Sequence, residues 1–134
     1  MRLLFLFFSL IIFCSITTLK GQSNVVVDNL LHSGVALYRA GDYPRAEKLL
    51  RRAIERAQEP RQPDELAEAH CFLAESLFSL NLETEAVHHF RVAEHILANE
   101  INHPESRPYY YRILLGLATT ATEDTIRKAY YNQL

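Results

Sequence analysis

A pattern of small and apolar residues occurs twice in this chain at a constant offset. Small residues match small ones, and large apolar residues match large ones, at six pairs of positions: Gly34/Ala74, Leu37/Leu77, Tyr38/Phe78, Ala46/Ala86, Leu50/Phe90 and Ala53/Ala93. Six pairs at one offset indicate an internal repeat. The offset is 40 residues in every pair. A repeat of 40 residues predicts units that stack on one another, because a single unit leaves its apolar face uncovered.

Each repeat predicts two helices joined by a tight turn. In the first unit, Gly41-Asp42 separates two stretches with helical apolar spacing, and Pro44 fits only the first turn of the second helix. The second unit predicts helices over about 63–79 and 84–99, after a linker that contains Pro60 and Pro63. Two further helices are expected over about 108–117 and 123–134.

No segment shows sustained alternation of apolar and polar residues, which a half-buried strand would require. Residues 25–27 are three valines that suit either a short strand or the first turn of a helix. We therefore predict an all-α fold, with helix-turn-helix repeats stacked as a short α-solenoid of about six helices. The repeats occupy residues 22–104, in two units over about 28–60 and 64–100.

The first unit resembles the tetratricopeptide repeat (TPR), a helix-turn-helix unit of about 34 residues. The resemblance is carried by the spacing of Gly34, Ala46 and Ala53 and by the sequence Gly-Asp-Tyr-Pro-Arg-Ala at 41–46. It extends to about residue 99, and the extra length of the repeat falls in the linker near 59–64. The resemblance implies a protein-interaction module of adaptor or co-chaperone type.

In the TPR family the first helix of each unit lines a concave groove that binds a peptide or helix. The resemblance therefore implies groove positions at Leu31, Val35, Tyr38, Arg39, Cys71, Glu75, Phe78 and Ser79. The family's clamp for carboxylate tails of chaperones needs Lys and Asn where Leu31 and Val35 stand. We therefore expect a different partner, a protein segment with apolar anchors.

Residues 105–134 admit two interpretations. Tyr-Tyr-Arg-Ile-Leu-Leu-Gly-Leu at 110–117 and Ile-Arg-Lys-Ala-Tyr at 126–130 resemble the opening of a J domain, but the His-Pro-Asp motif of that family is absent. In that family Arg127 and Lys128 would face a luminal chaperone of the heat-shock 70 type, which implies a truncated J-domain co-chaperone. The alternative is a third, incomplete repeat, because Gly116 follows Ala74 at close to the repeat offset.

The first 21 residues have the layout of a secretory signal peptide. A basic start at Arg2 precedes an apolar run over 3–16, and polar residues follow before Gly21. We expect export to the endoplasmic reticulum lumen, the periplasm or the exterior. The alternative is an uncleaved membrane anchor formed by residues 3–19, whose length is at the lower limit for a spanning helix.

Charge and residue types argue against several functions. The chain has 14 Lys and Arg against 16 Asp and Glu, and cleavage after residue 21 would remove Arg2 and Lys20 and leave a net charge of −4. Nucleic acid is therefore not an expected partner. His70, His88, His89 and His95 lack the converging spacing of a zinc site, and no Ser–His–Asp set or Gly-rich phosphate loop is present. We expect no enzyme activity, no cofactor and no metal.

The second helix carries a basic row, Lys48, Arg52 and Arg56, with four-residue spacing. The simpler interpretation of such a row is a solvated helix face. The alternative is a docking site for an acidic partner.

Overall fold

The computed structural model describes residues 25–57, 63–121, 127–128 and 131–134. The predicted signal peptide at 1–21, most of the linker and half of the sixth predicted helix lie outside these residues. Between residues 25 and 121 the chain forms an N-terminal helix, described over 25–39, and then α2 (Tyr43–Arg56), α3 (Pro63–Ser79), α4 (Glu83–Glu100), the 3-10 helix η1 (Pro104–Ser106) and α5 (Tyr110–Thr120).

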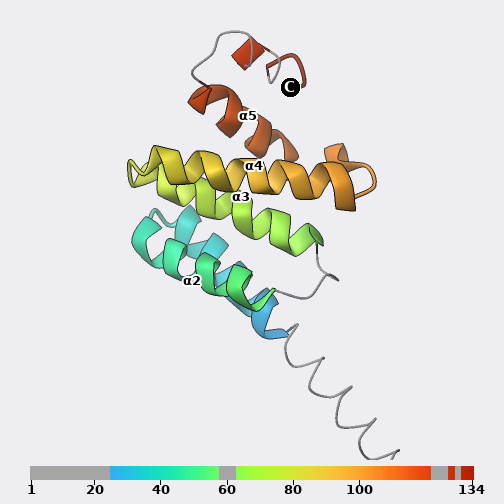
Figure 1. Cartoon of the computed structure of the whole chain (residues 1–134). Helices are drawn as coiled ribbons and strands as arrows, with labels where there is room; N and C mark the ends of the chain where they lie inside the picture. The colour runs from blue at the N-terminus through green and yellow to red at the C-terminus, as the bar shows by residue number, and fades with distance from the viewer. Residues whose placement is uncertain (1–24, 58–62, 122–126, 129–130) are drawn as a thin grey trace, which may run out of the picture.

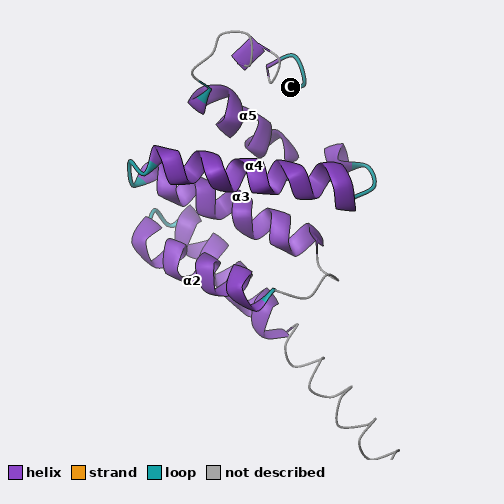
Figure 2. Cartoon of the chain, in the orientation of Figure 1, coloured by secondary structure: helices purple, strands orange, loops and turns teal. Residues whose placement is uncertain are grey.

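The all-α prediction is confirmed for the part of the chain that the structure describes, where no strand occurs (Figure 2). The valines at 25–27 belong to the N-terminal helix. The helices form a stack in which α2 packs on α3, α3 on α4 and α4 on α5 (Figure 1). The fifth helix begins slightly later than the sequence predicts, because Arg107 to Tyr109 form a turn before it, and it ends at Thr120 rather than at about residue 117.

The internal repeat is visible in the backbone of the two turns. Gly41 and Asn81 both have positive φ, at 80° and 61°. The N–H groups of Asp42 and Leu82, the residues that follow them, donate to the carbonyls of Leu37 and Leu77, both at 2.9 Å. Each helix therefore ends in the same Schellman arrangement, which satisfies carbonyls that the helix end leaves free. Asn serves at the second turn because it tolerates the left-handed region.

The small residues of the repeat are the points of closest helix contact. Ala46, Ala53, Ala74, Ala86 and Ala93 are fully buried. Two glycines allow still closer approach: a Cβ on Gly34 would lie 2.8 Å from Cγ of Leu50, and a Cβ on Gly116 would overlap the ring of Phe90. Leu50 and Phe90 are equivalent positions of the repeat. In both units the large side chain at this position packs against a glycine.

A polar contact fastens the start of α5 to the start of α3. The Tyr109 hydroxyl donates to the carbonyl oxygen of Asp64 at 2.9 Å and to its carboxylate, and Nε of Arg107 lies 2.9 Å from the same carboxylate. Burial and the Asp64 bond raise the pKa of Tyr109, so the hydroxyl stays protonated and keeps donating. This contact holds α5 across the end of the stack.

We expect Gly34→Ala to lower the free energy of unfolding by about 1–3 kcal/mol, because the new methyl group has no room beside Leu50. In a Leu50→Ala background the same change should be neutral or stabilising by about 0.5–1 kcal/mol, since alanine favours the helix once the space is free. Urea unfolding of the four proteins measures this coupling.

Gly41→Ala is the control for that cycle. Gly41 has φ of 80° and no heavy atom within 4 Å of the added Cβ, so its cost of about 1 kcal/mol comes from the backbone alone. The cost should be the same in the unchanged chain and in the Leu50→Ala background. Equal costs of Gly34→Ala in the two backgrounds would contradict the packing account.

Candidate interaction site

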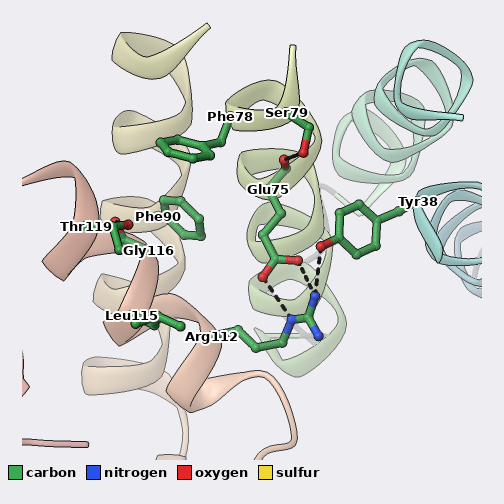
Figure 3. Close-up of a pocket in the computed structure, with 9 residues that line it drawn as sticks. All are labelled: Tyr38, Glu75, Phe78, Ser79, Phe90, Arg112, Leu115, Gly116 and Thr119. Carbon is green, nitrogen blue, oxygen red and sulfur yellow. Dashed lines mark hydrogen bonds and ion pairs between the residues drawn. The ribbon is translucent and has the colours of Figure 1, made fainter. Parts of the chain in front are cut away.

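A hollow opens where the N-terminal helix, α3, α4 and α5 come together. Its volume is about 230 Å³. The lining residues are Tyr38, Glu75, Phe78, Ser79, Phe90, Arg112, Leu115, Gly116 and Thr119, and we call this hollow the α3–α5 pocket (Figure 3). It has a polar end at Arg112 and an apolar end at Phe78.

The polar end is an ion pair that joins α5 to α3 and to the N-terminal helix. Nε and Nη2 of Arg112 donate to the two carboxylate oxygens of Glu75, at 2.9 and 2.5 Å, and Nη2 also donates to the Tyr38 hydroxyl at 3.0 Å (Figure 3). The guanidinium carbon lies 5.0 Å from the centre of the Phe72 ring, which adds a cation–π contact. This bidentate geometry orients the guanidinium rigidly.

At neutral pH the Arg112 guanidinium stays charged and the Tyr38 hydroxyl stays protonated. The bonds to Glu75 raise the pKa of Arg112. Burial, followed by the Glu75 charge, raises the pKa of Tyr38 to about 12. Nη1 of Arg112 makes no hydrogen bond within the part of the chain that the structure describes. Nη1 is therefore a guanidinium donor that the described residues leave unused.

The apolar end consists of aromatic and aliphatic side chains at the mouth of the pocket and one ring beneath them. Phe78 is 42% exposed and Leu115 is 48% exposed, whereas Phe90 is buried. Gly116 contributes no side chain, so the Phe90 ring stays in contact with α5. Two exposed large apolar side chains around a hollow are a feature of surfaces that bind other proteins.

The structure brings four of the sequence-predicted groove residues together. Tyr38, Glu75, Phe78 and Ser79 all line the α3–α5 pocket. Arg39 is exposed but does not line it. Whether any of them binds a partner stays a prediction.

The expected groove positions Leu31, Val35 and Cys71 need correction. These side chains are only 2%, 6% and 0% exposed and belong to the hydrophobic core, so they present no surface to a partner. Cys71 also faces the start of α5, with its sulfur 3.9 Å from the Tyr109 carbonyl oxygen, and burial raises the pKa of its thiol. Helix α5 packs against α3 and covers part of it. The groove prediction used only the two repeat units and did not include this helix.

Five of the nine lining residues were not included in the groove prediction: Phe90, Arg112, Leu115, Gly116 and Thr119. Four of them lie on α5, at spacings of three and four residues that place them on one helix face. This spacing is visible in the sequence. The sequence does not show which helix packs against that face, because this depends on how α5 crosses α3 and α4.

The two residues expected to face a chaperone, Arg127 and Lys128, lie near the C-terminal end of the chain. Arg127 is exposed and its Nη2 donates to the Ala121 carbonyl at 2.9 Å, and Lys128 is exposed. Their contact with a chaperone stays a prediction. No group of three or more His, Cys, Asp or Glu side chains suited to a metal ion occurs among the described residues.

Two of the histidines instead pair with each other between α3 and α4. Nδ1 of His70 lies 2.8 Å from Nδ1 of His89, so one ring donates and the other accepts. Burial lowers the pKa of both rings to about 4, and the neighbouring His88 charge adds to this effect. At neutral pH the pair is uncharged and serves the α3–α4 packing.

No protein-family model, no curated protein and no solved structure matches this chain. Among the helices described, none is both long enough and apolar enough to cross a membrane.

We expect Arg112→Gln to reduce the free energy of unfolding by about 1–3 kcal/mol, because it leaves the mostly buried Glu75 carboxylate without its charged partner. Adding Glu75→Gln should recover part of this loss, which chemical unfolding of the single and double variants will show. Arg45→Gln is the control, since its ion pair with Asp42 is exposed and contributes at most about 0.5 kcal/mol. Equal losses at positions 112 and 45 would contradict this account.

We also expect stability to fall as the pH is lowered from about 6.5 to about 4. The folded-state pKa values of His70 and His89 lie below the ordinary value of 6.5, so in this window the unfolded chain binds more protons than the folded one. The penalty is complete below pH 4 and absent above about 7.

A His70→Gln/His89→Gln variant should lose part of this pH dependence in thermal unfolding between pH 4 and 7. His95→Gln, which changes an exposed histidine on α4, should keep the slope of the unchanged protein. Identical slopes in all three proteins would show that the pair does not titrate as proposed.

Proposed function

We propose that this chain is a non-enzymatic protein-interaction module of TPR type, an adaptor or co-chaperone of the secretory pathway. It would bind a peptide or helix of a partner protein in the α3–α5 pocket. The observation that carries the proposal is the pair of exposed side chains, Phe78 and Leu115, beside a fixed guanidinium donor. The secretory assignment depends on the signal-like residues 1–21.

The size and chemistry of the pocket favour a protein partner over a small metabolite. Its volume of about 230 Å³ is below the range of roughly 300–1,000 Å³ that is usual for small-molecule sites. It suits one apolar side chain of a partner, inserted between Phe78 and Leu115. The backbone carbonyl of the same segment could then accept from Nη1 of Arg112.

The titratable groups of the pocket do not favour acid–base chemistry. Glu75 is the one carboxylate among the lining residues, and both of its oxygens are bonded to Arg112. Tyr38 titrates far above neutral pH. A general acid or base works best with a pKa near the operating pH, which the Tyr38 hydroxyl does not offer. These features support binding rather than catalysis.

Capture of partners from a secretory-compartment extract tests the proposal. With the full chain as bait, Phe78→Ala and Leu115→Ala should each reduce partner recovery by about tenfold, because each removes an exposed apolar contact at the centre of the site. Helical circular dichroism should be unchanged, since both side chains are about half exposed.

Leu82→Ala is the matched control. Leu82 is 45% exposed, close to the values for Phe78 and Leu115, but it does not line the pocket. The Leu82→Ala variant should recover the same amount of partner protein as the unchanged chain. Full recovery with Phe78→Ala and Leu115→Ala, or an equal loss with Leu82→Ala, would refute the assignment of the pocket.

A further inference from the structure

The exposed side of α2 presents three cationic side chains in a row along the helix. Lys48, Arg52 and Arg56 are all exposed. Their four-residue spacing places them on one helix face, about 6 Å apart along the axis. We call them the α2 basic row.

The α2 basic row has no acidic partner within the part of the chain that the structure describes. Its neighbours on the same helix do: Arg45 pairs with Asp42 at 3.3 Å, and Arg51 pairs with Glu47 at 2.9 Å and with Glu85 at 2.6 Å. The fold thus uses Arg51 to join α2 to α4. Among the described residues, none neutralises the charges of the row.

Stabilisation of the helix does not account for the whole row. Cations in the last turn interact favourably with the negative end of a helix, which explains Arg56. The effect falls off within one turn, so it does not explain Lys48, which lies two turns earlier. The helix carries five Lys and Arg against two Asp and Glu, although the whole chain has 14 against 16.

The shape of this surface favours an acidic protein segment. The row is narrow and about 12 Å long, which suits one helix or strand of a partner. The exposed side chains of α2 are Pro44, Arg45, Lys48, Arg52, Glu55 and Arg56, and none is an aromatic or large aliphatic group that could enter a membrane or stack on a base. Glu55 would repel a phosphate backbone but can attract one basic residue of a protein.

We infer that the α2 basic row docks an acidic helical segment of a partner protein, with carboxylates at four-residue spacing facing Lys48, Arg52 and Arg56. No residue of α2 lines the α3–α5 pocket. The two surfaces can therefore be occupied together, and the chain would bridge two protein segments.

The test uses the full chain and a helix-forming peptide with three Glu at four-residue spacing. Binding is measured by fluorescence anisotropy at low and at near-physiological salt. Lys48→Gln/Arg52→Gln/Arg56→Gln should weaken binding by about tenfold, because three exposed ion pairs each contribute a small amount. The affinity of the unchanged chain should fall with added salt, and a peptide with the same residues in scrambled order should bind as weakly as the triple variant does.

The charge-matched control is Arg39→Gln/Arg91→Gln/Lys128→Gln, which removes three exposed cations from parts of the chain outside α2. It should keep peptide binding within about twofold. An equal loss in both triple variants would overturn the inference, because it would show attraction by net charge alone. So would a larger loss of binding by the α2 variant to vesicles of phosphatidylcholine and phosphatidylserine, or to a short DNA duplex, than to the peptide.

Discussion

The stack depends on close contact between a glycine on one helix and a large side chain on the next. Gly34 packs against Leu50, and Gly116 packs against Phe90. Neither contact leaves room for a methyl group on the glycine. Buried alanines continue the same contacts at the other repeat positions. Because interiors are packed to near-crystalline density, these sites set the distance between helices, and the larger apolar residues then fill the remaining volume. The two helix-ending turns, with Gly41 and Asn81 in left-handed conformation, keep each pair of helices in that register.

The same contact creates the candidate site. The contact of Gly116 with the Phe90 ring brings α5 close to α4, and this position leaves Leu115 and Arg112 at the edge of α3. Arg112 then bonds to Glu75 and Tyr38, which ties three helices together and closes the polar end of the pocket. Its apolar end stays open, with Phe78 and Leu115 about half exposed. Stability and the proposed binding therefore depend on neighbouring residues of one helix face, with Gly116 contributing to the packing and Leu115 to the exposed surface.

The groove residues expected from the repeat register fall into two groups, those that line the pocket and those that lie in the core. Tyr38, Glu75, Phe78 and Ser79 were expected in a groove, and they line the pocket. Leu31, Val35 and Cys71 were expected there on the same register, and they are buried. A register fixes which residues share a helix face, but a face is wide enough to include both the edge that packs and the edge that stays open. Which residues fall on each edge depends on the angle at which the next helix crosses, and no local spacing determines that angle.

The sequence by itself determined the all-α class, the order and approximate limits of five helices, and the positions at which helices touch. These properties follow from local physics: apolar spacing, turn residues and the need for small side chains at close contacts. Only the tertiary structure decided that Arg112 meets Glu75, that His70 pairs with His89 and that α5 supplies four of the nine residues of the pocket. Each of these contacts joins residues that are far apart in the chain. Such contacts depend on how whole helices pack, because the free energy of burying their combined apolar faces outweighs the preference of any single residue.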